Sequence, residues 1–297
     1  MNKGVIYGAA AYGLWGFFPL YFKLLGSINS VQIVAHRVIW SLAFLAILLV
    51  LRREVAGLWA SLTRRTVLTY LTAAVLLAIN WLVFVYSVTA GHALEASLGY
   101  FINPLINVLL GSLFLGERPR PVQWVAIGLA AAGVAYMTFS LGAFPWIALT
   151  LATSFGLYGL VKKTAPLNSL YGLSLETMLL APPALLYLAF AEVTGSGAFG
   201  HSDPLITLLI VLLGVGTAIP LLLFASAARR IPLTTMGILQ YISPTLQFFS
   251  SVFLFGEAFT AERLVGFGAI WLALIIFTLE SYISHRRSLA AEAVALS

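Results

Sequence analysis

The sequence lacks cysteine and is poor in charge. Without cysteine, disulfide bonds and thiol chemistry are excluded. Only 9% of the 297 residues are charged, whereas soluble domains carry about 25%. The sequence also lacks an HExxH motif, a Walker phosphate-binding loop and a Cys/His set of metal ligands. We therefore expect no enzyme, no cofactor and no metal, and any active transport would be driven by a gradient rather than by nucleotide hydrolysis.

Hydrophobic residues make up 61% of the chain. They form runs of about 20 residues, the length of a helix that crosses a bilayer. Because lipid offers the backbone no hydrogen bonds, such runs are expected to be helices. The predicted fold class is therefore an all-α polytopic membrane protein surrounded by the lipid bilayer. The first run is aromatic-rich and contains Lys23, which favours a retained span over a signal peptide. Ten spans are predicted, at about 4–25, 32–51, 67–90, 95–115, 121–139, 145–162, 169–190, 205–226, 234–255 and 261–283.

Positive charges are distributed unevenly between the two ends of these spans. With the N-terminus in the cytoplasm, thirteen of the 16 Lys and Arg residues fall on the cytoplasmic side. This bias predicts a multi-pass protein of the bacterial inner membrane with both termini cytoplasmic. It also accounts for the net charge of +6 without a nucleic-acid partner. The thirteen residues are Lys3, Arg52, Arg53, Arg64, Arg65, Arg118, Arg120, Lys162, Lys163, Arg229, Arg230, Arg286 and Arg287.

One long apolar segment occurs twice. Residues 95–117 read EASLGYFINPLINVLLGSLFLGE, and residues 235–257 read TMGILQYISPTLQFFSSVFLFGE. Pro104 and Pro244 lie 140 residues apart in this alignment. Each proline removes a backbone donor in the middle of a span. This predicts either a kink that belongs to the transport path or a static kink that only fixes packing.

The repeat divides the chain into two halves. Residues 1–140 and 141–287 are each predicted to hold five spans, followed by a short cytoplasmic tail at 288–297. Because five is odd, the two halves enter the membrane from opposite sides and form inverted repeats. Glu117 and Glu257 each end a span, and we expect them to act as structural caps. Inverted repeats commonly place a transport site near the bilayer midplane, between the repeats.

Four motifs together resemble those of a known family. They are LEASLGYFINPLINVLLG at 94–111, GERPRPVQW at 116–124, AHRVIWS at 35–41 and NWLVFVYSV at 80–88. On these motifs, residues 1–287 resemble RarD-type members of the EamA family, in the drug/metabolite transporter superfamily. The resemblance implies a ten-helix transporter with a central cavity and alternating access. The family's name as chloramphenicol-sensitivity proteins suggests a link to drug response without identifying a substrate.

Three ionisable residues lie inside predicted spans. Such a residue costs about 2.5–3.5 kcal/mol on insertion scales, so it calls for a partner or a function. His36 and Arg37 lie in the second span and Glu176 in the seventh, 140 residues after His36. One hypothesis places all three at the cavity, with His36 or Glu176 carrying a proton, since histidine titrates near neutral pH. In the alternative, Arg37 extends to the interface and Glu176 pairs within the bundle.

Polar side chains in the third and fourth spans are further candidates for the cavity. Asn80 and Trp81 lie mid-span, where an amide requires a partner in a neighbouring helix or a substrate. Tyr100, Asn103 and Asn107 follow the i, i+3, i+7 spacing of one helical stripe. We expect Asn80, Trp81, Tyr100 and Asn103 to contact substrate.

The same alignment extends the candidate site into the second half. The stripe residues align with Gln240, Ser243 and Gln247 at the offset of 140. Gln240, with its neighbour Tyr241, is predicted to line the cavity. Trp15 and Tyr158 occupy matching Gly-Leu-aromatic-Gly motifs, and flat rings can line a pocket. The alternative role of these aromatic residues is helix packing or interfacial anchoring.

The sequence thus predicts a secondary transporter of a small amphipathic metabolite or drug-like molecule. Export is implied by the resemblance, and coupling to a proton or ion gradient is a hypothesis. A facilitative channel and a non-transporting membrane scaffold are the alternatives. The sequence does not determine the oligomeric state.

Overall fold

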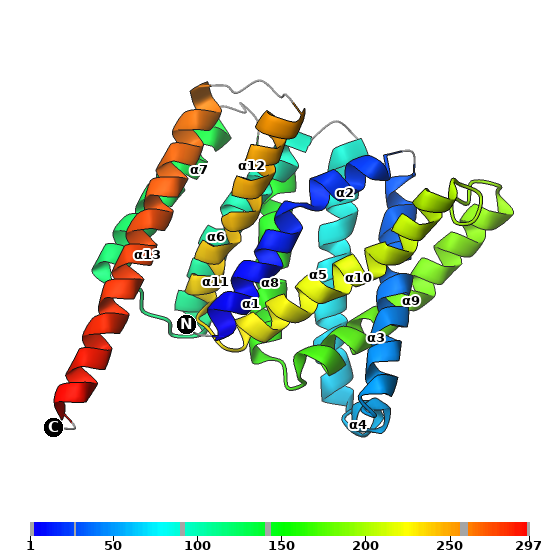
Figure 1. Cartoon of the computed structure of the whole chain (residues 1–297), viewed down its shortest axis with the longest axis horizontal. Helices are drawn as coiled ribbons and strands as arrows, with labels where there is room; N and C mark the ends of the chain where they lie inside the picture. Colours follow the sequence, from blue (N-terminus) through cyan, green and yellow to red (C-terminus); the bar gives the residue numbers. More distant parts are fainter. Residues whose placement is uncertain (1–2, 27, 90–92, 140–143, 256–260, 296–297) are drawn as a thin grey trace.

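The computed structural model describes residues 3–26, 28–89, 93–139, 144–255 and 261–295, and the regular structure in these ranges is entirely helical (Figure 1). The helices are α1 (Lys3–Gly16), α2 (Phe18–Leu24), α3 (Ser30–Leu51), α4 (Val55–Ala60), α5 (Arg64–Thr89), α6 (Ala93–Phe114), α7 (Pro121–Phe139), α8 (Trp146–Thr164), α9 (Ser169–Val193), α10 (Pro204–Ala228), α11 (Leu233–Gln240), α12 (Ile242–Phe255) and α13 (Ala261–Ala295).

Three of the long helices begin at a side-chain cap. The side-chain oxygens of Asn29, Asn168 and Asp203 accept hydrogen bonds from the first turns of α3, α9 and α10. Asn and Asp are favoured there because the first amides of a helix have no partner within it. These caps fix where α3, α9 and α10 begin, and each lies between two apolar segments.

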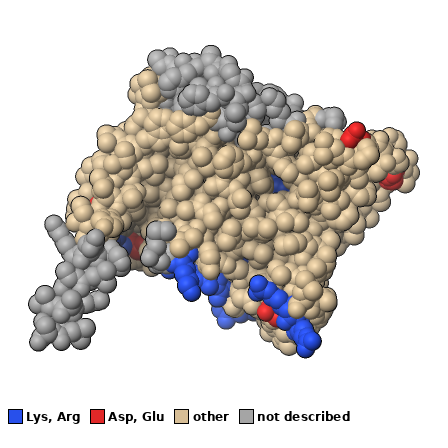
Figure 2. Space-filling model, viewed as in Figure 1, with Lys and Arg blue, Asp and Glu red and all other residues tan. Residues whose placement is uncertain are grey.

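The outer surface of the molecule is apolar. Large hydrophobic side chains such as Phe139, Leu186 and Val193 are exposed, and uncharged residues cover most of the face that Figure 2 shows. Seven of the described helical segments are long and apolar enough to cross a bilayer, at 3–22, 30–51, 64–87, 121–139, 169–193, 204–228 and 264–284. The chain is therefore a multi-pass membrane protein.

The three remaining predicted spans have shorter or less apolar helices. The described apolar part of α6, Leu98–Phe114, is shorter than 18 residues. Helix α8 ends in Lys162 and Lys163. The predicted span 234–255 is divided into α11 and α12 at Tyr241. The ten-span count and the inverted repeat accordingly stay predictions.

The two prolines of the repeated segment lie in different local structures. Helix α6 continues through Pro104 as one helix. In the second copy the helix is interrupted at Tyr241, three residues before Pro244. A proline cannot donate to the carbonyl four residues earlier, so Pro244 leaves the Gln240 carbonyl without its helical partner. The interruption thus lies beside a residue of the candidate site.

Segments from the two ends of the chain pack against each other. Helix α1 contacts α10, α11 and α12, and α6 contacts both α8 and α11. Helices α7 and α13 run side by side at one flank of the molecule (Figure 1). The Cα atom of Gly237 in α11 approaches α6 so closely that a Cβ there would lie 2.6 Å from the Pro104 carbonyl oxygen. The first and second halves therefore share one interior.

Basic side chains gather on one side of the molecule. In Figure 2 they follow the lower edge, where Figure 1 places α4. The exposed cations at the ends of α3, α5 and α10 are Arg52, Arg53, Arg64, Arg65, Arg229 and Arg230. An apolar body with cations at one end matches the charge asymmetry of membrane proteins.

Candidate functional site

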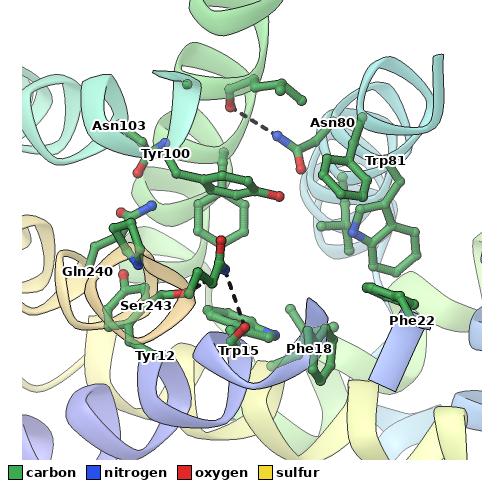
Figure 3. Close-up of a pocket in the computed structure, with 18 of the residues that line it drawn as sticks. Tyr12, Trp15, Phe18, Phe22, Asn80, Trp81, Tyr100, Asn103, Gln240 and Ser243 are labelled. Carbon is green, nitrogen blue, oxygen red and sulfur yellow. Dashed lines mark hydrogen bonds between the residues drawn. The ribbon is translucent and has the colours of Figure 1, made fainter. Parts of the chain in front are cut away.

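A cavity of about 150 Å³ lies where the two halves of the chain meet. Its lining comes from α1, α2, α3, α5, α6, α8, α10, α11 and α12. Figure 3 shows aromatic rings and amides directed into it. The lining residues are Tyr12, Trp15, Phe18, Phe22, Arg37, Leu77, Asn80, Trp81, Phe84, Gly99, Tyr100, Asn103, Leu151, Phe155, Leu221, Gln240, Ser243, Pro244 and Gln247.

Packed aromatic rings form one wall of the cavity. The ring of Trp15 lies 5.6 Å from that of Tyr12 and 5.8 Å from that of Phe155, both edge to face. Phe224 lies behind them and stacks on Tyr158 at 5.8 Å. Edge-to-face and offset contacts are the favoured arrangements of aromatic pairs, so these rings stabilise one another.

Arg37 supplies the cation of the cavity. Its guanidinium carbon lies 4.4 Å from the centre of the Trp81 ring, and 5.8 and 5.9 Å from the rings of Phe18 and Phe22. Its Nε donates to Thr217 Oγ1 at 3.1 Å. The residue is only 8% exposed, and the ion pairs of the described residues do not include it.

Two asparagines on opposite sides of the cavity are anchored to α8. The amide nitrogen of Asn80 donates to the Leu151 carbonyl at 2.9 Å and to Ser154 Oγ at 3.1 Å. The amide nitrogen of Asn103 donates to the Ala152 carbonyl at 2.6 Å. These bonds fix both side chains, and Figure 3 shows the oxygen of Asn80 directed toward the cavity.

The polar stripes of the repeated segment meet across α6 and α11. Asn107 donates to Asn103 Oδ1 and to Gln240 Oε1, each at 3.1 Å. Gln247 donates to Ser243 Oγ at 3.2 Å. Asn103, Gln240, Ser243 and Gln247 also line the cavity, whereas Asn107 lies behind them. Both copies of the repeated segment therefore contribute polar side chains to the same cavity.

Eight of the thirteen predicted site residues lie together in the lining of the cavity. They are Trp15, Arg37, Asn80, Trp81, Tyr100, Asn103, Gln240 and Pro244. Pro104, the other predicted kink residue, lies in the contact of α6 with α11 near Gly237. The cavity placement expected for His36, Tyr158, Glu176 and Tyr241 differs from what the structure shows, because none of them belongs to this lining.

Helix geometry accounts for two of these differences. Consecutive residues on an α-helix point about 100° apart, so Arg37 and Gln240 face the cavity while His36 and Tyr241 do not. His36 lies 5.6 Å from the Phe199 ring, in a separate hollow that also includes Glu192. Tyr241 donates to the Phe101 carbonyl at 3.3 Å within the core.

Tyr158 and Glu176 belong to a buried ion pair with Lys162. The Lys162 ammonium lies 2.6 Å from Glu176 Oε1, and the Tyr158 hydroxyl donates to Glu176 Oε2 at 3.0 Å. Lys162 is 3% exposed and Glu176 0%. Lys162, counted among the positive charges of the cytoplasmic side, lies in the last turn of α8, and its ammonium points inward to Glu176. The expected alternative, that Glu176 pairs within the bundle, agrees with the structure.

Glu117 caps a helix from a distant part of the chain. Its carboxylate accepts from the backbone amides of Leu233 and Thr234 at 2.6 and 2.9 Å, at the start of α11. Lys163 lies 3.9 Å from the same carboxylate. The expectation of a structural cap is confirmed for Glu117, while Glu257 lies outside the described residues.

Several aromatic residues of the lining were missed by the sequence reasoning. Tyr12, Phe18 and Phe22 come from α1 and α2, and Phe84 and Phe155 from α5 and α8. The aromatic-rich first span carried a signal, but of its rings only Trp15 was predicted to line the cavity. Which of its rings face inward depends on the break between α1 and α2 near Phe17.

Comparisons with known proteins identify the family. The model of the EamA-like transporter family matches residues 2–139. The chain is 44% identical to an uncharacterized transporter of Vibrio cholerae serotype O1, over 94% of this chain and 93% of the relative. It is 42% identical to the RarD protein of Escherichia coli (strain K12), over 97% of each. It is 46% identical to the uncharacterized transporter YojE of Bacillus subtilis (strain 168), over 93% of this chain and 94% of the relative.

A solved crystal structure has the same fold. It superimposes with a TM-score of 0.72 and 17% identity, over 94% of this chain and 98% of the other. The sequence relatives cover nearly the whole chain and carry the names of transporters and of RarD proteins. Together with the apolar helices and the cavity between the two halves, these likenesses show that the chain is a membrane transporter of the RarD type and belongs to the EamA-like transporter family.

Proposed function

We propose that this chain is a secondary transporter that exports a small amphipathic organic molecule. The observation that carries the proposal is the cavity of about 150 Å³ lined by helices from both halves of the chain. Its aromatic walls suit an apolar body, and its fixed amides and Arg37 suit a polar end. The eight predicted residues that share the lining would contact this molecule.

The mechanism we propose is alternating access, in which the two halves rock around the cavity. The architecture would be ten spans in two inverted repeats, at 1–140 and 141–287, with the tail at 288–297. Each predicted span overlaps a described helix or helix pair, which supports the count. The interruption at Tyr241 supplies a point where α11 and α12 can move separately.

The proposed orientation places the basic side of the molecule, and both termini, in the cytoplasm of a bacterial inner membrane. Because the chain has no cysteine, single cysteines can be introduced without background. Ala60→Cys lies on the basic side and Ser196→Cys in the connection after α9, both exposed. A membrane-impermeant maleimide should label intact cells carrying Ser196→Cys, and should label Ala60→Cys only after permeabilisation. The reverse pattern contradicts the orientation.

Transport itself can be tested with purified protein. We would screen thermal unfolding against amino acids, nucleosides, sugars, quaternary amines and chloramphenicol-like drugs at two pH values, since a ligand that binds the folded state raises its melting temperature. Each hit would then be tested for flux in proteoliposomes. Asn80→Ala and Tyr100→Ala should abolish both signals, and Gln123→Ala, an amide of α7 outside the cavity, should preserve them.

The alternatives predict different results in the same assays. A facilitative channel would give flux that neither saturates nor shows counterflow. A scaffold would give neither flux nor ligand response, and would tolerate alanine at Asn80 and Tyr100.

We propose a proton or ion gradient as the driving force, with His36 as the preferred proton carrier because Lys162 and Tyr158 already hold the Glu176 carboxylate. Flux that is indifferent to an imposed pH gradient would exclude the proton.

A further inference from the structure

Arg37 is the only charged residue among those that line the cavity in the described part of the chain. The other polar groups there are neutral amides and hydroxyls. Helix α9, which packs against α3, carries Glu176, but the Glu176 carboxylate is bound to Lys162 and lies outside the lining. A guanidinium keeps its charge under all physiological conditions. The described lining of the cavity therefore carries a fixed positive charge and no acidic side chain that could balance it.

The side chain of Arg37 is held from one edge and one face. Thr217 accepts from Nε, and the Trp81 ring lies against the guanidinium plane at 4.4 Å. Of the five N–H donors, the described residues occupy the one on Nε. The two terminal nitrogens form the part of the fork that pairs with carboxylates in two parallel hydrogen bonds. Because Arg37 lines the cavity, this end of the fork is available to a ligand there.

An unbalanced charge at this depth needs compensation. Cation–π contact with Trp81 offsets part of the cost of burial, but it leaves the net charge in place. A bound anion would supply the missing charge. We propose that the substrate of this cavity is a small organic monoanion, with its carboxylate at Arg37 and a planar apolar body against the aromatic wall. This proposal rests on the proposed transport function.

The remaining groups limit the class further. The described lining residues include no carboxylate that could bind an ammonium group, so a cation or a zwitterion gains less there than a simple anion does. The volume of about 150 Å³ is on the scale of a cavity that holds one benzene ring. A single aromatic ring bearing one carboxylate thus fits both the charge and the size.

A purely structural Arg37 would show a different pattern of binding. It would join α3 to α10 through Thr217 and to α5 through Trp81 without favouring any ligand charge. The test therefore compares ligands that share a ring and differ in charge: phenylacetate, phenylacetamide, phenylalanine and phenethylamine. Their affinities for the wild-type protein in detergent can be measured by isothermal titration calorimetry without any variant.

We expect phenylacetate to bind wild-type protein at least about tenfold more tightly than phenylacetamide, because its hydrogen bonds to Arg37 are charge-assisted. Arg37→Gln should remove this preference and leave the weak binding of phenylacetamide unchanged. Arg64→Gln, an exposed cation at the start of α5, is the matched control and should keep the preference. If Arg37→Gln fails to fold, two measurements still test the anion class. One is the preference of the wild-type protein for phenylacetate over phenylacetamide. The other is the weakening of that preference in Thr217→Val, which keeps the Arg37 charge but removes its hydrogen bond.

Flux in proteoliposomes separates the two levels of the proposal. Saturable flux of phenylacetate that Arg37→Gln abolishes supports both the anion class and the transport function. Equal binding and flux of phenylacetamide or phenethylamine overturns the anion class while the transport function stands. No binding and no flux with any of the four ring compounds or the wider ligand panel overturns both.

Discussion

Arg37 and Lys162 are both cations buried in the described part of the chain, and they have opposite surroundings. Lys162 has an acidic partner, Glu176, at 2.6 Å, and the pair is sealed within the bundle. Arg37 has a hydroxyl and three aromatic rings, and it borders a cavity. Both are charges in a membrane protein, where an ionisable group requires a reason.

The difference separates a role in folding from a role in function. The charge of Lys162 is balanced within the fold, so its removal is expected to affect mainly stability. The charge of Arg37 is left unbalanced beside a space that a ligand can enter, so its removal is expected to affect mainly binding. An exposed pair, Arg120 with Glu280, provides a third case in which neither effect should be large.

The largest expected effect follows from breaking the sealed pair. Glu176→Leu leaves Lys162 buried without a counter-charge and should lower the free energy of unfolding by about 3–5 kcal/mol. Denaturant titration of the detergent-solubilised protein measures this. The double variant Lys162→Met/Glu176→Leu removes both charges and should recover most of the loss. If the double variant is as unstable as the single one, the ion pair is not the cause.

A smaller change in stability is expected at Arg37. Arg37→Gln loses the contact with Trp81 and the bond to Thr217, but it also removes an unbalanced buried charge, so the free energy of unfolding should change by less than about 2 kcal/mol. The same titration without ligand measures it. A loss as large as that of Glu176→Leu would mean that Arg37 is a structural residue.

Thr217 tests how Arg37 is positioned. Thr217→Val keeps the volume and removes one hydroxyl, which should cost about 1 kcal/mol of stability. With Nε unbound the guanidinium gains freedom, so phenylacetate should bind a few-fold more weakly in calorimetry while phenylacetamide is unaffected. Equal weakening of both ligands would point to a general distortion of the cavity instead.

The smallest effect is expected at the exposed pair. Arg120 Nε lies 2.5 Å from Glu280 Oε1, with the arginine side chain 46% and the glutamate side chain 14% exposed, so the pair reaches solvent on the arginine side. Glu280→Gln should change the free energy of unfolding by about 0–1 kcal/mol, since water and salt screen such pairs. Melting temperatures at low and high salt measure it. A loss of stability comparable to that of Glu176→Leu would mean that burial does not explain the difference between the two ion pairs.

The sequence predicted the residue types of the cavity better than their orientation. The alignment of Tyr100 and Asn103 with Gln240 and Ser243 identified residues from both halves that the structure brings together. Tyr241 was included as the neighbour of Gln240, and His36 as an ionisable residue inside a span, 140 residues before Glu176. A repeat in sequence indicates a similar depth in the membrane, but rotation about the helix axis depends on packing. The pattern alone therefore does not say which neighbouring side chains face this cavity.

Long-range partners were beyond the reach of the pattern. Lys162 resembled a topology signal because it lies next to Lys163 at the end of an apolar run. The carboxylate that binds the Lys162 ammonium inside the bundle is that of Glu176 in α9, the next helix along the chain. The rings around Arg37 likewise come from α2 and α5, and their approach depends on how the first span is broken. Glu176 carried the one usable signal, since a buried carboxylate calls for a buried cation.

The measurement that tests the central claim most directly is the thermal unfolding of wild type, Arg37→Gln and Glu176→Leu, each with and without saturating phenylacetate. The contrast between the two cations predicts that Arg37→Gln melts close to wild type but loses the ligand-induced rise. Glu176→Leu should melt well below wild type and keep the rise. If Arg37→Gln retains the rise, or if Glu176→Leu alone abolishes it, the assignment of one cation to the ligand and the other to the fold is wrong.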